Sequence, residues 1–129
     1  MAIRVTTIGT ATLARMGIYK DNGNFSPGAL LADLGTVAIG STGLKEISGL
    51  AQVLEANSVY WMVTLYDGTV TLNVNIPSSQ VNYIGTDPVT TQQGISEIQV
   101  AQAFGALPDP FTGGGVYSTG GSRLVFLRF

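Results

Sequence analysis

Residues 59–76 read VYWMVTLYDGTVTLNVNI, and this stretch carries the clearest structural signal in the chain. Asp67-Gly68 suits a two-residue turn with positive φ, so the stretch predicts a β-hairpin. If Tyr66 pairs with Thr69, Val59, Trp61, Val63 and Leu65 lie opposite Ile76, Val74, Leu72 and Val70, and all eight of these residues fall on one face. A shift of the strand pairing by one residue would turn these apolar side chains outward. The turn residues and the apolar pattern therefore agree on one register, and this register predicts that Trp61 lies in the core.

The opposite face of the same hairpin is predicted to be polar but uncharged. It carries Tyr60, Met62, Thr64 and Tyr66 against Asn75, Asn73, Thr71 and Thr69. We expect this face to lie at the surface.

The rest of the chain has the same character, with 17 glycines and many Thr, Val and Ser residues in short runs between turn residues. This pattern predicts an all-β fold, and we expect one antiparallel β-sandwich of the jelly-roll kind spanning residues 1–129. The predicted strands are Ile3–Ile8, Thr12–Tyr19, Leu30–Ile39, Gly43–Leu54 with a break, Val59–Tyr66, Thr69–Ile76 and Arg123–Phe129.

Residues 77–121 contain Pro108, Pro110 and the triple glycine 113–115, so we expect loops there and little core. Within them, GISEIQVAQAF (94–104) alternates at Ser96, Ile98 and Val100, which favours a strand over a helix. The last strand, RLVFLRF, does not alternate between its two arginines. It is therefore predicted to be a central strand or one covered by a neighbouring subunit.

Composition limits the function. The chain has no histidine and no cysteine, which removes the commonest metal ligand, the usual general base and any disulfide or thiolate site. Charged residues make up only 11%, against about a quarter in an ordinary soluble domain, and mean hydropathy is +0.32. We therefore expect a protein that is not an enzyme and that covers part of its apolar surface with partner subunits.

The charge and the apolar runs of the chain also disfavour nucleic-acid and membrane partners. The net charge of −2 comes without the basic stripe that would follow a phosphate backbone, so we expect no nucleic-acid partner. The longest apolar run, residues 59–66, is far shorter than the about 20 residues of a spanning helix. No targeting signal is visible at the N-terminus. We expect no membrane partner.

Four patterns in the sequence are candidates for chemical sites, and for each of them a purely structural role is favoured. The acids Asp33, Glu46, Glu55, Asp67, Asp87, Glu97 and Asp109 are widely spread and several suit turns, which disfavours a catalytic pair. The run Asp21-Asn22-Gly23-Asn24 has no glutamate further on, so it predicts a tight turn and not a calcium loop. The glycines at 113–115 and 120–121 lack a following Lys-Ser or Lys-Thr, and Tyr60, Tyr66 and Tyr83 suit packing better than sugar stacking. The sequence thus predicts no catalytic, cofactor-binding or metal-binding residues.

The segment from residue 14 to residue 65 resembles tail-fibre and other virion structural modules of bacteriophages. The matching features are Arg15-Met16-Gly17-Ile18-Tyr19, the Asp21 and Gly23 turn, Pro27-Gly28, Leu30-Leu31 with Asp33 and Gly35, Gly43 with Lys45-Glu46-Ile47, Tyr60-Trp61, LPDPF at 107–111 and the final RLVFLRF. The resemblance implies a virion structural protein on a β-sandwich scaffold, and it names no ligand.

The chain begins at Met1 and has no room for a fibre shaft, so we expect a complete small protein in an assembly. The favoured function is a capsid decoration or cement protein, a homotrimer that bridges neighbouring major capsid proteins on the virion, assembled in the bacterial host cytoplasm. The alternative is a receptor-binding head of a tail fibre or spike that recognises a surface glycan through Tyr and Asn. A carbohydrate-active enzyme is a more remote third reading.

Overall fold

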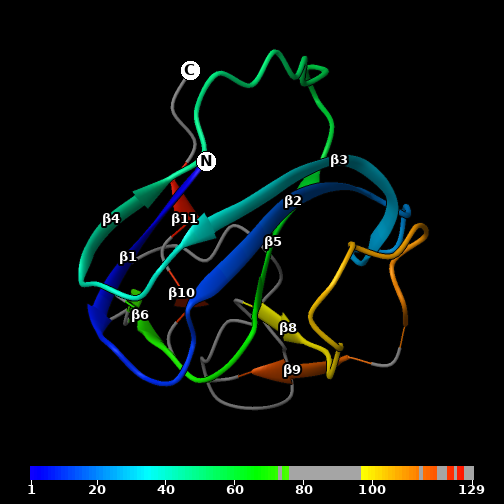
Figure 1. The fold of residues 1–129 in the computed structure, drawn as a ribbon. Coiled ribbons are helices and arrows are strands. Elements are labelled where there is room, and N and C mark those ends of the chain that lie inside the picture. The colour runs from blue at the N-terminus through cyan, green and yellow to red at the C-terminus, as the bar shows by residue number, and fades with distance from the viewer. Residues whose placement is uncertain (73, 76–96, 114, 119–121, 124, 127–129) are drawn as a thin grey trace.

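The computed structural model describes residues 1–72, 74–75, 97–113, 115–118, 122–123 and 125–126 of the 129-residue chain. Every regular element in these residues is a β-strand, and all pairings between them are antiparallel, which confirms the all-β prediction (Figure 1). The strands are β1 (Ala2–Thr7), β2 (Leu13–Asp21), β3 (Pro27–Ala38), β4 (Gly43–Glu46), β5 (Tyr60–Tyr66), β6 (Thr71–Leu72), β7 (Val74–Asn75), β8 (Glu97–Gln99), β9 (Val116–Ser118), β10 (Ser122–Arg123) and β11 (Val125–Phe126).

The first sheet has the order β3-β2-β5, with β2 in the middle. β2 and β3 form a hairpin whose ladder shifts register at three points, so β3 is an irregular edge strand. β5 pairs with β2 without a shift, from Ala14 opposite Tyr66 to Lys20 opposite Tyr60. This sheet positions every surface discussed below.

The second sheet has the order β11-β1-β4, and β6 also pairs with β1. β4 and β11 flank the first half of β1, and β6 lies beside its second half. Two short pairs, β7 with β10 and β8 with β9, complete the described strands.

A bent two-stranded ribbon joins the two sheets. Residues 8–12 lead from β1 to β2, residues 67–70 lead from β5 to β6, and these two connections run side by side. The backbone N–H of Ala11 donates to Thr69 O at 2.9 Å, and the N–H of Asp67 donates to Leu13 O at 3.3 Å. Both chains of the ribbon therefore pass from one sheet into the other, which is how strands form a corner between packed sheets.

The predicted hairpin of residues 59–76 is wrong. Of its two arms, β5 pairs with β2 and β6 pairs with β1, so Val63 and Leu72 lie in different sheets. The physical reason is a long-range capping contact. The Asp67 carboxylate accepts hydrogen bonds from the backbone N–H groups of Thr12 and Leu13 at 2.8 and 2.9 Å and from the Thr12 hydroxyl, so the turn residues bind another segment instead of closing on themselves.

Two glycines allow these two connections to lie so close together. A methyl group on Gly9 would collide with the backbone oxygen of Thr69 and lie 2.7 Å from its carbonyl carbon. A methyl group on Gly68 would lie 2.7 Å from the Thr10 hydroxyl and 2.9 Å from the backbone nitrogen of Ala11. The bend therefore requires the absence of a side chain at both positions.

The core lies between the two sheets. Its buried residues come from β1, β2, β6 and the segments beside them: Met1, Ile3, Val5, Ala11, Ala14, Met16, Ile39 and Leu72. Tyr66 packs against this cluster from β5. Side chains of paired residues share a face of the sheet, so Tyr66 faces the core with Ala14.

The predicted core face of β5 is therefore wrong. Leu65, Val63 and Trp61 pair with Arg15, Gly17 and Tyr19, on the side of the sheet that faces away from the core cluster. Trp61 is half-buried and not part of the core. Val70 and Leu72 were expected on the apolar face, and both do contact the core cluster.

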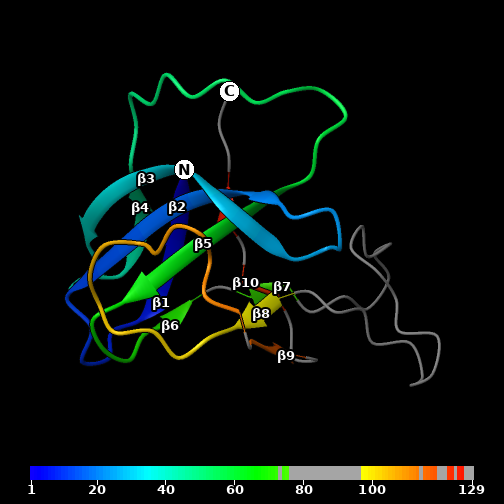
Figure 2. The ribbon, with the colours of Figure 1, turned by 90° about the vertical axis from the view of Figure 1, so that its right-hand side faces the viewer.

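The outer face of the first sheet has its own cover, the strap of residues 107–111. Leu107 is 7% exposed and packs over Gly17, where an added methyl group would collide with the end of the Leu107 side chain. Tyr19 is fully buried and packs edge-on against Phe111, with ring centroids 5.3 Å apart. The ribbon of this segment, in orange, passes in front of the first sheet in Figure 2. Loops were rightly expected in this region, but the expectation of little core was wrong for Leu107.

The other local predictions have mixed outcomes. The strand predicted at 43–54 ends at Glu46, and residues 47–59 form a strand-free connection to β5. The strand in GISEIQVAQAF is confirmed for Glu97–Gln99, whereas residues 100–104 are irregular. Among the described strands, β11 has β1 as its one partner, and coverage of the last strand by a subunit stays a prediction.

Candidate interaction surface

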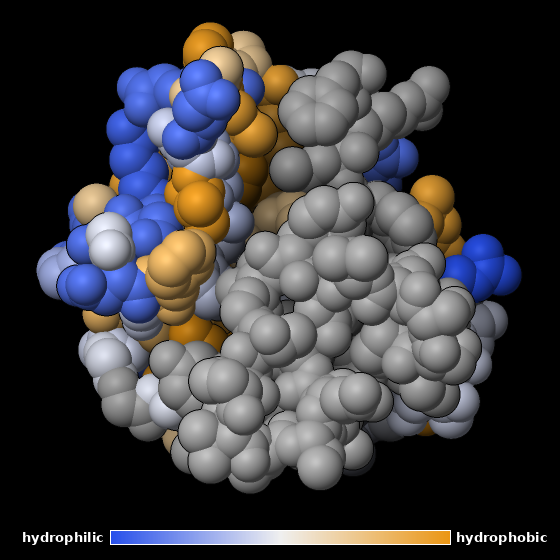
Figure 3. Space-filling model, turned by 180° about the vertical axis from the view of Figure 1, so that it is seen from behind, coloured by the Kyte–Doolittle hydropathy of each residue, from blue (hydrophilic) through white to orange (hydrophobic). Residues whose placement is uncertain are grey.

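Large apolar side chains are exposed at several places on the described surface. They are Ile8, Leu13, Phe25, Leu44, Leu50, Val53, Val59 and Met62. Seen from behind, apolar residues reach the surface between hydrophilic ones (Figure 3). Since single exposed apolar residues are normal in soluble proteins, position and local geometry decide which of them matter.

The tip, residues 21–26, connects β2 to β3 and has a fixed turn geometry. The Asp21 carboxylate accepts from the backbone N–H of Gly23 at 2.7 Å, and the Asn22 side chain accepts from that of Asn24 at 2.8 Å. The N–H of Asn22 donates to Ser26 O at 2.9 Å, which closes the loop. These Asx turns confirm the turn predicted from the sequence.

Phe25 is the unexpected residue of the tip. It is 66% exposed, and its φ of 53° lies in the left-handed region. This conformation costs a bulky residue about 1 kcal/mol, whereas Gly or Asn adopts it readily. Asn57, the other non-glycine residue with positive φ among those described, is of the expected type. No contact within the described part of the chain therefore accounts for a phenylalanine at position 25.

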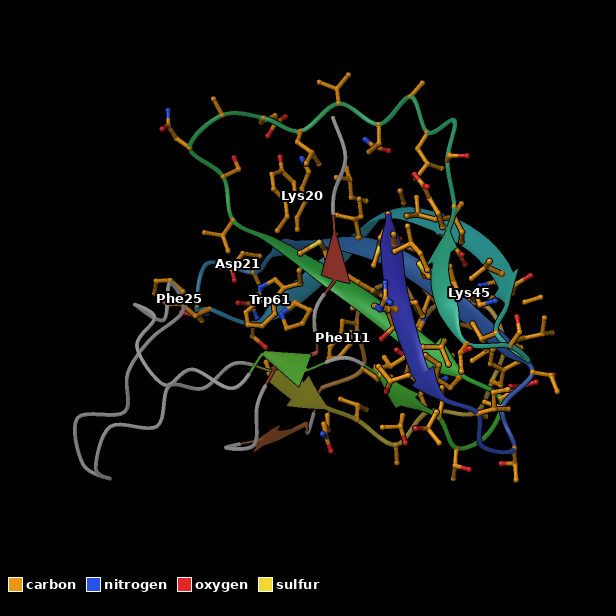
Figure 4. All side chains as sticks on the ribbon, turned by 90° about the vertical axis from the view of Figure 1, so that its left-hand side faces the viewer. Lys20, Asp21, Phe25, Lys45, Trp61 and Phe111 are labelled. Atoms are coloured by element: carbon orange, nitrogen blue, oxygen red, sulfur yellow. The ribbon has the colours of Figure 1, made fainter. Side chains whose placement is uncertain are left out.

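Trp61 joins β5 to the base of the tip. Its indole N–H donates to Asp21 Oδ2 at 2.8 Å, and Figure 4 shows Trp61 beside Asp21, with Phe25 further out. This hydrogen bond is the main cause that lowers the pKa of Asp21; desolvation opposes it, and backbone N–H groups of the tip add to it. The carboxylate is ionised at neutral pH, and no lysine or arginine of the described chain forms an ion pair with it.

The arch, residues 48–59, is a second exposed segment and rises above the sheets between β4 and β5 (Figure 1). Its Val53 is 79% exposed. Three contacts tie it to the first sheet: Lys20 lies 3.6 Å from the Glu55 carboxylate, the Glu55 N–H donates to the Tyr60 hydroxyl at 2.8 Å, and the Asp21 N–H donates to Val59 O at 3.1 Å. The first sheet thus supports both the tip and the arch.

The strap is held on the outer face by polar contacts. The Tyr19 hydroxyl donates to Pro108 O at 2.7 Å, the Leu30 N–H donates to Asp109 at 2.9 Å, and the Phe111 N–H donates to Gly28 O at 2.9 Å. Burial raises the pKa of Tyr19, and the charges of Asp109 and Asp33 raise it further. The strap therefore covers part of β3's edge.

Asp33 links the strap to β2. It forms an ion pair with Arg15 at 2.9 Å and accepts from the N–H groups of Gly35 and Leu107 at 3.1 and 3.3 Å. Burial raises the pKa of Asp33, but the hydrogen bonds and the Arg15 charge outweigh it, and the pKa lies below its ordinary value. Arg15, Asp33 and the LPDPF segment at 107–111 thus meet in one contact network.

Of the acids considered as a catalytic pair, Asp33, Glu55, Asp67 and Asp109 make structural contacts. Asp67 is held by Thr12 and Leu13, and its pKa is lowered first by the Thr12 hydroxyl and then by the Leu13 N–H. Asp87 and the side chain of Glu97 lie outside the described residues. Within the described part of the chain, no three acidic, histidine or cysteine side chains gather as a metal site would require.

The tyrosines proposed for glycan stacking are less exposed than expected. Tyr60 is half-buried and bonded to the arch, and Tyr66 packs against the core while its hydroxyl donates to Thr64 at 2.7 Å. Tyr83 and Gly120-Gly121 lie outside the described residues. The sequence reasoning missed Phe25, although an aromatic residue after Asp-Asn-Gly-Asn was a visible signal.

Comparison with protein-family models, curated proteins and solved structures finds no match for the chain. None of the described segments forms a helix that could cross a membrane. Any functional conclusion therefore depends on the surfaces described above.

Proposed function

We propose that the protein is a structural component of a bacteriophage particle, a decoration or cement protein that stabilises the head through contacts with neighbouring major capsid proteins. The single observation that carries this proposal is the surface: eight large apolar side chains are exposed among the described residues, on a chain with only 11% charged residues. A surface of this kind favours burial against partner proteins.

The described carboxylates support a structural role over catalysis. Asp21, Asp33 and Asp67 each accept hydrogen bonds that fix a turn, the strap or the ribbon bend, and each has a lowered pKa. A general acid at neutral pH needs a raised pKa instead. The rigid sheet carrying the tip and the arch is suited to presenting contact surfaces.

The assembly we propose is a homotrimer of jelly-roll-like β-sandwiches on the outside of the virion, assembled in the bacterial host cytoplasm. The bent ribbon supports a sandwich, since strands that change sheets at a corner are typical of such packing. Each copy would contribute modest binding energy, and many symmetric contacts would act together.

Capsids lacking the protein provide the test. We expect purified protein to co-sediment with them saturably, to raise their disruption temperature, and to run as a trimer in light scattering. A monomeric protein that leaves such capsids unbound and no more stable would refute the proposal.

The second candidate is a receptor-binding head that recognises a surface glycan. The exposed Phe25 next to Asn24 at the tip favours it, because aromatic faces with neighbouring amides suit sugar rings. A glycan array would show specific binding that Phe25→Ala abolishes without unfolding the protein. Absence of binding across the array would eliminate this candidate.

A further inference from the structure

We propose that the tip is a docking site for an arginine side chain of a partner protein, with the guanidinium on the Asp21 carboxylate and the flanking apolar residues on Phe25. The identification of the partner as a capsid protein depends on the proposed function. The chemistry of the site does not.

The negative charge of the Asp21 carboxylate makes the tip a suitable site for a cation. The Asp21 carboxylate is ionised, lies at the base of the tip, and has no cationic partner in the described chain. Lys20 is its neighbour in sequence, but the Lys20 side chain is directed toward the arch, where it meets Glu55 at 3.6 Å (Figure 4). A positively charged group from another molecule would find this carboxylate already held in place by Trp61 and Gly23.

The aromatic surroundings select arginine among cations. A guanidinium is planar, weakly hydrated and stacks on aromatic rings, whereas an ammonium holds its water more strongly. Phe25 and Trp61 lie on either side of Asp21 and offer such rings (Figure 4). Carboxylate and aromatic side chains together thus match an arginine flanked by apolar residues.

Phe25 points to a protein as the partner. It projects from the end of the β2–β3 hairpin, so it requires a hollow in the other molecule. Aromatic residues that fill a partner's pocket are typical interface hot spots. A phenylalanine held at a φ of 53°, where Asn or Gly would be more stable, is explained by such a contact.

The first experiment uses a short acetylated and amidated peptide with one arginine between two leucines, and the same peptide with neutral citrulline in place of arginine. Trp61 is the chain's one tryptophan, so its indole N–H gives a single side-chain indole signal in a proton–nitrogen NMR spectrum. We expect the arginine peptide to shift this signal saturably, with a dissociation constant of order 1 mM. The citrulline peptide should bind at least about tenfold more weakly, which corresponds to about 1.4 kcal/mol.

Variants separate the site from the fold. Phe25→Asn suits the left-handed backbone, should keep or raise the melting temperature, and should weaken peptide binding about tenfold or more. Val53→Asn on the arch also replaces an exposed apolar side chain with asparagine and should leave binding unchanged. No saturable shift, equal binding of the citrulline peptide, or equal binding by Phe25→Asn would overturn the proposal. The proposal would also be overturned if the wild-type protein formed an oligomer that Phe25→Asn dissociates and the peptide left the Trp61 signal unchanged. The tip would then bind a second copy of this chain.

Capsid binding distinguishes this proposal from the proposed function. If wild-type protein leaves capsids unbound, the proposed function fails, and the peptide experiment still decides the arginine site. If wild-type protein binds capsids, Phe25→Asn should lose about 30-fold in affinity, as for a hot-spot residue, while Val53→Asn binds normally. Equal capsid binding by wild type and Phe25→Asn would show that the tip does not contact the capsid.

Discussion

The bend of the two-stranded ribbon makes the sharpest prediction about the fold. In Gly9→Ala, the new methyl group collides with the backbone oxygen of Thr69, and backbone atoms on the facing chain cannot swing away as a flexible side chain would. Overpacking of this kind costs about 1–3 kcal/mol, and the stiffer unfolded chain returns about 0.4–1 kcal/mol. The net loss is about 1–2 kcal/mol, or roughly 3–10 °C in melting temperature for a chain of this length.

Gly40→Ala is the matched control, because a methyl group on Gly40 meets nothing within 4 Å. Urea unfolding followed by Trp61 fluorescence measures both variants. We expect a lower midpoint for Gly9→Ala at an unchanged slope, and a midpoint at or slightly above wild type for Gly40→Ala. Equal midpoints for the two variants would refute the side-by-side placement of residues 8–12 and 67–70.

Three further predictions concern the strap and the carboxylates. Leu107→Ala removes a buried side chain from the outer face and should cost about 2–4 kcal/mol in urea unfolding; a loss within experimental error would show that the strap is not packed. Tyr19→Phe leaves the Pro108 carbonyl without its donor and should cost about 1 kcal/mol, measured in the same way, whereas an unchanged stability would contradict the hydrogen bond. The lowered pKa values of Asp21, Asp33 and Asp67 mean that the unfolded chain binds more protons than the folded one. The stabilisation from these groups is therefore fully present above their unfolded pKa of about 3.9 and is lost as the pH falls through their pKa values in the folded protein. A melting temperature that stays constant when the pH is lowered below about 4 would contradict this prediction.

The sequence predicted the strands better than their partners. Alternation over residues 59–66 correctly indicates a strand, because period two is a local property of the chain. The partner of that strand depends on Asp67, whose carboxylate binds backbone groups 54 and 55 residues away in sequence. The same Asp-Gly dipeptide suits a tight turn and a long-range cap, so local chemistry could not choose between them.

The face of β5 was misread for a related reason. β5 has partly buried residues on both faces, Tyr66 toward the core and Trp61, Val63 and Leu65 on the outer face, where the strap covers the neighbouring strand β2 at Gly17 and Tyr19. The more apolar face, with Trp61, was assigned to the core, because nothing local showed that residues 107–111 cover the outer side. Tyr66, on the face predicted to be polar, contacts the core cluster instead.

The candidate site was predictable in part. Asp21-Asn22-Gly23-Asn24 predicts the turn at the tip, since Asp and Asn side chains bond the backbone two residues on. The pairing of Asp21 with Trp61 joins residues 40 apart in sequence and follows from the sheet register, which the sequence did not reveal. The unusual backbone of Phe25 likewise needs the three-dimensional structure.

A three-dimensional reconstruction of intact virions would show whether this protein has the proposed structural role on a phage head. We expect density matching this fold on the outside of the head, at junctions between major capsid proteins, with the tip against a neighbouring chain. A particle that lacks this density on the head, or that carries it at the end of a tail fibre, would refute the proposed role.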